Sequence, residues 1–413
     1  MRAARFFIKS VFCILLICTV LIFGAVIFAR NSIDVEYKIK KGDSFNVDTP
    51  IPVTAVYEGA EVTQTSLTTI GEEYDVDLKL FGIIPVKSVN VEVVDEMYVA
   101  ILGTPFGMKI YTDGVLVSEI TEVQTKYGLK NPAKQAGIQK GDYIISVDGK
   151  KVYTNEDLSE IVEKSGGKQM KFTVRRGEKD FTKTVTAVIS SETDSYKIGI
   201  WIKDSSAGIG TLTFYSPASN VIGGLGHGIC DDETGELLQL NSGEIVTAEI
   251  TDVEKGSAGS PGQLEGRFSQ ETIGDISLNS DCGVYSYIKG KRSFSNYTEI
   301  ALKQEVKSGK GQILCTVDGE TPQLYDCKIT VRTSAYLSKT QNMVVTVTDK
   351  RLLDKTGGIV QGMSGSPVLQ DGKLVGAVTH VLVDDSTKGY AIFAENMLET
   401  AKNVEQSELK KAS

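Results

Sequence analysis

The chain has 413 residues, of which 23% are charged and 41% hydrophobic, and this length allows two or three folded domains. The formal net charge is −9, and no patch rich in Lys and Arg interrupts the acidic background, which excludes nucleic acid as a partner class. Gly is abundant, with 41 residues, and Pro is scarce, with 9, a balance that favours short strands joined by glycine turns.

The first segment of the chain is apolar. From Ser10 to Ala29 no residue is charged, and twenty helical residues at about 1.5 Å each span the roughly 30 Å hydrocarbon core of a bilayer. Basic residues at positions 2, 5 and 9 precede this run, which predicts a cytoplasmic N-terminus and an exported body. We therefore predict a transmembrane signal anchor over residues 1–30; the alternative is a signal peptide cleaved after Ala29.

Residues 31–90 are predicted to form a β-rich stalk, because Tyr74 to Leu80 alternates as strands do. Four cysteines lie beyond the anchor: Cys230, Cys282, Cys315 and Cys327. No Cys-x-x-Cys pair occurs, so no zinc or redox site is predicted. Cys315 and Cys327 flank a predicted hairpin turn, where a disulfide and two free thiols are both open alternatives.

Residues 91–190 contain the run Pro132-Ala-Lys-Gln-Ala-Gly-Ile-Gln-Lys-Gly-Asp-Tyr-Ile-Ile-Ser-Val-Asp-Gly149. Its first Gly suits a helix C-cap, and its final Asp-Gly is a hairpin signal. This run resembles a PDZ domain. The resemblance implies a groove beside the helix Asn155–Lys164, in which an extended peptide is captured as an added strand. A PDZ domain that only packs on its neighbour is the alternative.

The resemblance to PDZ domains also implies a glycine loop that binds the carboxylate of the peptide through backbone N–H groups. We expect this loop at Gly103, Thr104, Pro105, Phe106, Gly107 and Met108.

Residues 195–413 run almost entirely in short strands with glycine turns, which predicts a β-barrel or sandwich body. This body contains the chain's two histidines, His227 and His380. Serine becomes a nucleophile when a nearby base takes its proton, so a serine enzyme needs one of these histidines within hydrogen-bond reach. His227, set among glycines in Gly223-Gly-Leu-Gly-His-Gly, is the predicted base, and His380 is a structural or substrate-facing alternative.

Ser364 lies in the turn Gly362-Met-Ser-Gly-Ser-Pro, where glycines allow a strained turn that exposes the hydroxyl. The N–H groups of Gly362, Met363 and Ser364 are predicted to form an oxyanion hole. A carboxylate should orient the imidazole, and Asp349, 15 residues before the serine, is the predicted acid. Asp281, 54 residues after His227, is the rival on chain order.

Three longer strings extend this pattern: Gly199-Ile-Trp-Ile-Lys-Asp-Ser-Ser-Ala-Gly-Ile-Gly-Thr-Leu-Thr-Phe-Tyr, Gly224-Leu-Gly-His-Gly-Ile, and the stretch from Thr348 to Pro367. Together they resemble the SpoIVB family of serine peptidases, and the resemblance covers anchor, PDZ domain and peptidase domain in that order. It implies a mainly β chain ending in a trypsin-like double β-barrel. It also implies a triad of His227, Asp349 and Ser364 that needs no metal or cofactor.

The same resemblance implies a membrane-linked endopeptidase of endospore-forming bacteria, acting between the two membranes around the forespore. Such enzymes cut a regulatory membrane protein to release a sigma factor, and they process their own N-terminal region. The rival hypothesis is a catalytically inactive, membrane-tethered PDZ adaptor.

Overall fold

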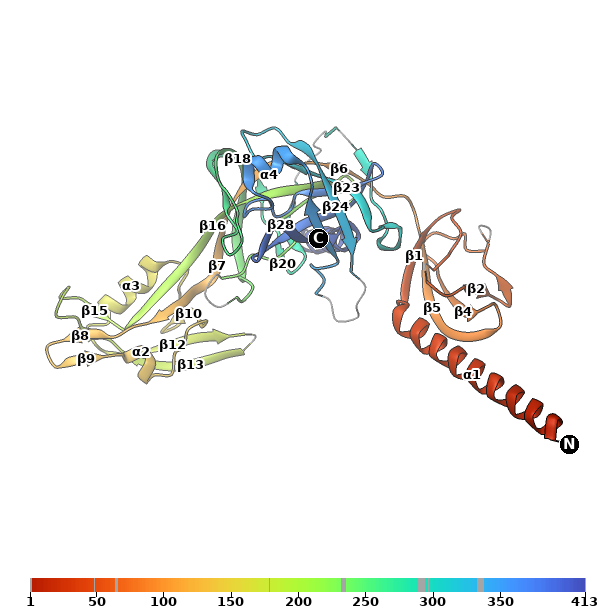
Figure 1. Cartoon of the computed structure of the whole chain (residues 1–413). Coiled ribbons are helices and arrows are strands. Elements are labelled where there is room, and N and C mark those ends of the chain that lie inside the picture. The colour runs from red at the N-terminus through yellow and green to blue at the C-terminus, as the bar shows by residue number, and fades with distance from the viewer. Residues whose placement is uncertain are drawn as a thin grey trace.

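The computed structural model describes residues 2–47, 49–63, 66–177, 179–231, 235–288, 294–295, 297–332 and 338–412. Three bodies follow one another in space, with the N-terminal domain at one end, the peptidase domain in the middle and the PDZ domain at the far end (Figure 1). The predicted mainly β fold class is confirmed, and an apolar helix lies at the N-terminus.

The N-terminal domain consists of one long helix and a small sheet. Its elements are α1 (Arg2–Ser32), β1 (Glu36–Lys40), β2 (Val53–Tyr57), β3 (Ala60–Glu61), β4 (Glu73–Leu80) and β5 (Ile84–Val94), and the strand order is β1-β5-β4-β2-β3. Val11–Ser32 is long and apolar enough to cross a membrane, with a mean hydropathy of 3.1, as in a membrane anchor or a signal sequence. Ala29 and Ile33 at the end of the helix are buried in the core of the domain.

The PDZ domain lies within the peptidase fold and does not precede it. Its own elements are β8 (Val123–Thr125), β9 (Gly128–Lys130), α2 (Pro132–Gln135), β10 (Tyr143–Val147), β11 (Lys150–Lys151), α3 (Asn155–Lys164), β12 (Gln169–Arg176), β13 (Lys179–Thr186), β14 (Val188–Ile189) and β15 (Tyr196–Lys197). Both helices are capped at their N-termini: Asn131 accepts from Lys134 N at the start of α2, and Thr154 and Asp157 make a capping box on α3.

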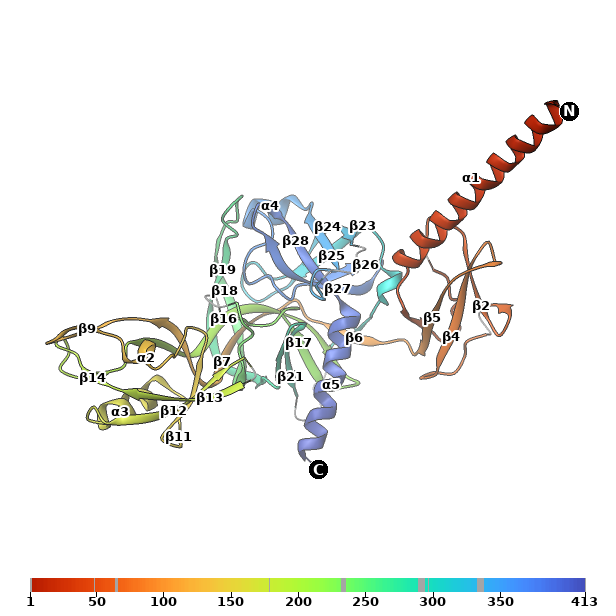
Figure 2. The same ribbon diagram turned by 90° about the horizontal axis from the view of Figure 1, so that it is seen from below.

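Two long antiparallel strands, β7 (Pro105–Ile120) and β16 (Ile200–Ser216), join the PDZ domain to the peptidase domain (Figure 2). Phe106 and Ile110 of β7 are buried in the peptidase core, whereas Val115 and Val117 of the same strand are buried in the PDZ core. The boundaries predicted at residues 91–190 and 195–413 therefore differ from the observed ones. Side chains on one continuous strand belong to two cores, and a composition shift along the chain does not mark such a change.

The first half of the peptidase domain continues the sheet that contains β7 and β16. Its other elements are β6 (Tyr98–Ile101), β17 (Val221–Gly224), β18 (Leu240–Glu254), β19 (Gln263–Asp275), β20 (Leu278–Ser280), β21 (Gly283–Tyr287), β22 (Tyr297–Glu299) and the 3₁₀ turn Lys303–Glu305. β17 pairs with β16 on one edge and with β21 on the other, which places the segment after β17 deep inside the fold.

The second half closes into an antiparallel barrel with strand order β23-β24-β25-β28-β27-β26. The elements are β23 (Gly309–Cys315), β24 (Gln323–Val331), β25 (Met343–Val347), α4 (Lys350–Thr356), β26 (Pro367–Gln370), β27 (Lys373–Leu382), β28 (Asp385–Phe393) and α5 (Ala394–Ala412). The C-terminal helix α5 carries many charged residues, but its Met397, Leu398 and Ala401 are buried in a core shared with the first half of the domain, so it is a packed element (Figure 2).

The two cysteines that flank the β23–β24 hairpin are both free and buried. Cys327 lies opposite Gly311 in the register, whereas Cys315 lies opposite Gln323, so the two thiols are four residues apart along the strands. Four residues of β-strand span about 13 Å, which is too far for a disulfide. The free-thiol alternative is therefore the one observed, and burial raises the pKa of both thiols.

Charged pairs fasten the N-terminal domain to the peptidase domain. Lys40 on β1, 5% exposed, contacts the carboxylates of Glu299 and Glu305, and Lys373 contacts the same two carboxylates. Burial raises the pKa of each of these two carboxyls, but their hydrogen bonds to the lysines outweigh this effect and lower it. The pairing therefore stabilises the fold at neutral pH. This stabilisation is lost as the pH falls below the ordinary pKa of a glutamate and through the lowered pKa values of Glu299 and Glu305.

Replacing Lys40 by Ala should lower the free energy of unfolding by about 2 kcal/mol, because two partly buried carboxylates lose a partner. Lys41→Ala is the matched control, since Lys41 is exposed and should change the stability by less than about 0.5 kcal/mol. Denaturant unfolding of both variants measures the difference. Equal midpoints for the two variants would show that the charged contact contributes nothing.

Candidate active site

Ser364 lies in the turn between α4 and β26, and this turn packs directly on the loop after β17. Gly365 has a φ of +94°, and a Cβ at this position would lie 1.9 Å from the carbonyl oxygen of Thr211 and 2.5 Å from the nitrogen of Leu225. Only glycine fits such an approach. The structure therefore brings the serine turn and the histidine loop, separated by more than a hundred residues in sequence, into backbone contact.

Two threonines of β16 hold the serine turn in place. Thr211 donates its N–H to Ser364 O at 2.9 Å and its hydroxyl to Gly362 O at 2.9 Å, and Thr213 donates its hydroxyl to Gly365 O at 2.7 Å. Both threonines are almost fully buried. The sequence analysis missed this role, although two threonines at alternate strand positions share one face and so offered a signal.

His227 follows β17 and lies half-buried. Its Nδ1 is 2.8 Å from the carbonyl oxygen of Gly228. Because a carbonyl only accepts, this bond assigns the ring hydrogen to Nδ1 and leaves the lone pair of Nε2 free. The imidazole therefore has the tautomer that a general base needs.

The predicted nucleophile and the predicted base meet at two consecutive residues of β27. The hydroxyl of Ser364 donates to the carbonyl oxygen of Thr379 at 2.6 Å. The next residue, His380, packs its ring on that of His227, with centroids 4.3 Å apart and planes inclined by 35°. Within the described part of the chain Ser364 makes no hydrogen bond to His227, so the hydroxyl must turn away from Thr379 before it reaches the imidazole.

The surroundings of His227 favour its neutral form. Removal from water and, to a smaller extent, the charge of His380 lower its pKa, the bond to Gly228 opposes both effects, and the resulting pKa is about 4. No carboxylate of the described residues contributes to this shift. At neutral pH the ring is therefore unprotonated and able to accept a proton.

The backbone N–H groups of the turn are not equivalent. Met363 donates its N–H to Val360 O at 3.1 Å and Gly365 donates to Val378 O at 2.7 Å, whereas the N–H groups of Gly362 and Ser364 have no acceptor among the described residues. The serine-peptidase template also uses the N–H groups of the nucleophile and of the residue two positions before it. Of the three predicted oxyanion donors, the structure leaves Gly362 and Ser364 available.

Asp349 lies away from the imidazole. Its carboxylate caps α4 by accepting from Arg351 N at 2.9 Å, and it pairs with the guanidinium of Arg351 at 2.7 Å, which lowers its pKa to about 2. Strand pairing places Val344 of β25 opposite Tyr390 of β28, and Tyr390 lies close to the level of His380 on the adjacent β27. Asp349 is five residues beyond Val344, and five residues of strand span about 16 Å. The structure therefore does not bring this predicted acid to His227, and its part in catalysis stays a prediction.

Asp281 is nearer to the histidine loop in space. It lies in the turn between β20 and β21, and a Cβ at Gly228 would lie 2.9 Å from the carbonyl oxygen of the preceding residue, Ser280. Its side chain is exposed. Asp281 therefore lies next to the loop that carries His227, but within the described part of the chain its carboxylate makes no hydrogen bond to the imidazole.

The predicted carboxylate-binding loop of the PDZ domain is wrong. Gly103, Thr104, Pro105, Phe106, Gly107 and Met108 lead into and begin β7, whose first residues pair with β16 on one edge and with β18 on the other. Phe106 is 0% exposed and packs beside Leu225 in the peptidase core. A strand that is paired on both edges has no N–H groups left for a peptide carboxylate.

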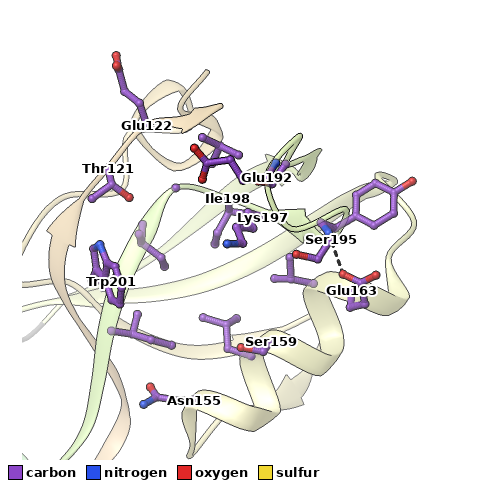
Figure 3. Close-up of a pocket in the computed structure, with 18 of the residues that line it drawn as sticks. Thr121, Glu122, Asn155, Ser159, Glu163, Glu192, Ser195, Lys197, Ile198 and Trp201 are labelled. Atoms are coloured by element: carbon purple, nitrogen blue, oxygen red, sulfur yellow. Dashed lines mark hydrogen bonds between the residues drawn. The ribbon is translucent and has the colours of Figure 1, made fainter. Parts of the chain in front are cut away.

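The groove of the PDZ domain lies beside α3, on the side that the sequence indicated, and its other wall is formed by residues 190–202 (Figure 3). Its volume is about 890 Å³, and its apolar lining includes Val123, Leu158, Val162, Ile198, Ile200, Trp201 and Ile202. Glu163 of α3 accepts from Tyr196 N at 2.8 Å and ties the helix to the opposite wall. Gly199, with a φ of +79°, immediately precedes β16, the strand that forms this wall.

Comparisons with known proteins identify a peptidase segment and a PDZ segment in the chain. Residues 194–398 match the SpoIVB peptidase S55 family model, and residues 130–176 match the PDZ domain model. A PDZ domain of the SdrC-like protein Lmo2051 from Listeria monocytogenes is 22% identical with a TM-score of 0.18, covering 22% of this chain and 90% of that one. An inactive mutant of Rv3671c from M. tuberculosis H37Rv is 13% identical with a TM-score of 0.23, covering 47% of this chain and 82% of that one.

The curated relatives match over shorter stretches. A putative zinc metalloprotease, mll0638, of Mesorhizobium japonicum is 27% identical over 37% of this chain and 39% of that protein. The serine protease HTRA1 of Xenopus laevis is 44% identical over 13% of this chain and 12% of that protein. The chain thus spans less than two fifths of the length of these relatives. From the peptidase and PDZ matches together with the site geometry, the chain belongs to the SpoIVB family of PDZ-containing serine peptidases.

Proposed function

We propose that the chain is an endopeptidase in which Ser364 attacks the substrate and His227 is the base. The hydroxyl oxygen of Ser364 bonds to the scissile carbonyl carbon while its proton passes to Nε2 of His227. The imidazolium then gives this proton to the leaving amine as the C–N bond breaks, and water resolves the acyl-enzyme by the same steps in reverse.

The observation that carries this proposal is the meeting of both residues on the dipeptide Thr379–His380. One carbonyl of this dipeptide holds the hydroxyl of Ser364, and the adjacent ring packs on His227. The N–H groups of Gly362 and Ser364 supply the oxyanion donors, on the same turn that Thr211 and Thr213 fix from β16. The resting hydroxyl is held by Thr379, so substrate binding must be accompanied by its rotation towards Nε2.

The cellular role follows the family. We propose that the enzyme is membrane-linked through α1 and acts between the two membranes around a forespore, where it cuts a regulatory membrane protein and its own N-terminal region. In this proposal the cleavage leads to activation of a sigma factor. The apolar helix and the peptidase family match support the proposal.

The PDZ groove fits the capture of an extended segment of a partner protein. Along Ile200–Lys203, β16 pairs with β7 on one edge, and no strand of the described residues pairs with its other edge. A peptide added there would continue the sheet, with its side chains in the apolar groove beside α3. An inactive adaptor would use the same groove, but it would not need a neutral imidazole beside a serine with two free oxyanion donors.

Replacing Ser364 by Ala should abolish labelling by a fluorophosphonate probe, while the free energy of unfolding falls by no more than about 1 kcal/mol, the typical contribution of one hydrogen bond. The hydroxyl is the group that reacts, and its hydrogen bond goes to the carbonyl of the buried Thr379. Ser260→Ala, an exposed serine in a similar glycine-rich turn, is the control and should label fully. Absence of labelling in the wild-type chain would favour the adaptor.

Replacing Thr213 by Val should slow labelling of Ser364 by roughly tenfold or more, because the buried carbonyl of Gly365 loses its donor and the turn loses its support. The swap keeps the side-chain shape, so the effect reports the hydrogen bond. Thr182→Val, at an exposed position of β13, is the control. Stopped-time labelling at fixed probe concentration measures both rates; equal rates would contradict the role given to Thr213.

Replacing Asp349 by Asn should lower thermal stability by removing a helix cap and an ion pair, while Ser364 still reacts with the probe. Asp281→Asn tests the rival carboxylate in the same assay. A folded Asp349→Asn protein that no longer labels would restore Asp349 as the orienting acid, and the same result for Asp281→Asn would assign that role to Asp281.

A further inference from the structure

The catalytic template assigns a carboxylate to hold the imidazole of the base, yet no carboxylate of the described residues contacts His227. Two other groups take up that position. The carbonyl of Gly228 accepts from Nδ1 at 2.8 Å, which fixes the tautomer, and the ring of His380 lies against the ring of His227 at 4.3 Å, which fixes the plane of the imidazole.

His380 is itself held in a defined place. It lies on β27, whose neighbours β26 and β28 belong to the closed barrel, and Thr379 before it is fully buried and donates its hydroxyl to Thr340 O at 2.9 Å. His380 is exposed and lies where the pairing of β27 with β28 shifts register between Val378 and Val381, and the buried Thr379 anchors this point of the strand. The loop that carries His227 has glycines on both sides of the histidine, and among the described residues its strand pairing is limited to the bridge between Cys230 and Leu237.

We propose that His380 is a positioning residue, which holds the ring of His227 so that Nε2 faces the hydroxyl of Ser364 once that hydroxyl leaves Thr379. The task that a carboxylate performs in the template is thereby divided between a backbone carbonyl and a second imidazole. This inference rests on the proposed function, because it assigns a role within the same Ser364–His227 reaction.

A second consequence follows from the charge of His380. When it is protonated, it opposes protonation of the neighbouring His227 and so extends the pH range in which the base is free. Titratable groups on the elements packed against the pair include Asp281, Cys282 and Tyr285 of the β20–β21 hairpin, Cys230 and Asp231 of the histidine loop, and Lys388 and Tyr390 of β28. The pKa values of both thiols and of the Tyr285 phenol are raised by burial, so these three groups stay neutral near pH 7.

The test compares His380→Ala and His380→Phe in the full-length chain, by the rate of fluorophosphonate labelling at Ser364 across the acidic and neutral pH range. His380→Ala removes the packing surface and should slow labelling by roughly 10²-fold, the size of effect that a misplaced catalytic group produces. His380→Phe keeps a flat ring and should recover most of the rate. In this variant the acidic limb of the profile should move to higher pH, because the charge that opposes protonation of His227 is gone.

Val383→Ala, in the exposed turn of the same hairpin, is the matched control and should leave both the rate and the profile unchanged. A merely structural role of His380 would reduce the amount of labelled protein without moving the acidic limb. Labelling of His380→Ala at the wild-type rate would overturn the proposal, and so would a Phe variant as slow as the Ala variant. If the wild-type chain does not label at all, it is the proposed function that fails.

Discussion

The contact between β16 and the serine turn is the constraint on which the rest of the structure depends. Thr211 bonds to the backbone on both sides of Met363, and Thr213 bonds to the next carbonyl, so three hydrogen bonds from one strand set the shape of the turn. The same strand pairs with β17, which ends three residues before His227. One strand thus places both Ser364, the proposed nucleophile, and the loop that carries His227, the proposed base.

The far end of β16 forms a wall of the PDZ groove. One strand therefore extends from this groove to the serine turn (Figures 1 and 2). β7 accompanies it along most of its length, and each strand contributes side chains to both cores. The PDZ domain is therefore an extension of the peptidase sheet. A rigid attachment of this kind differs from a flexible linker, in which the two domains would move independently.

Local sequence patterns were sufficient to predict those helices and turns whose conformation depends on neighbouring residues in the chain. An uncharged apolar run predicted the helix of the N-terminal segment, and the Ala-Gly and Asp-Gly signals predicted the short helix and hairpin of the PDZ domain. Glycines around Ser364 and His227 indicated close approaches, and the structure shows one at Gly365. The loop at 103–108 was misinterpreted because a glycine-containing run before a strand looks the same whether its edges are free or paired.

Long-range register could not be obtained from the sequence in the same way. Asp349 is 15 residues from Ser364 along the chain, but α4 intervenes, and Asp349 follows the end of β25 that is remote from the imidazole. The ring packing between the two histidines depends on how β27 lies against the loop after β17, and no spacing in the sequence encodes that contact. The threonines of β16 are recognised only when their carbonyl partners are known.

The most direct measurement of this account is a crystal structure of the full-length chain after reaction with a fluorophosphonate. The account predicts the phosphorus on the Ser364 oxygen, a phosphonyl oxygen about 3 Å from the N–H groups of Gly362 and Ser364, and Nε2 of His227 turned towards the adduct with its ring against His380. An adduct on another residue, or an imidazole facing away from the modified serine, would contradict the claim that this turn and this loop form one catalytic site.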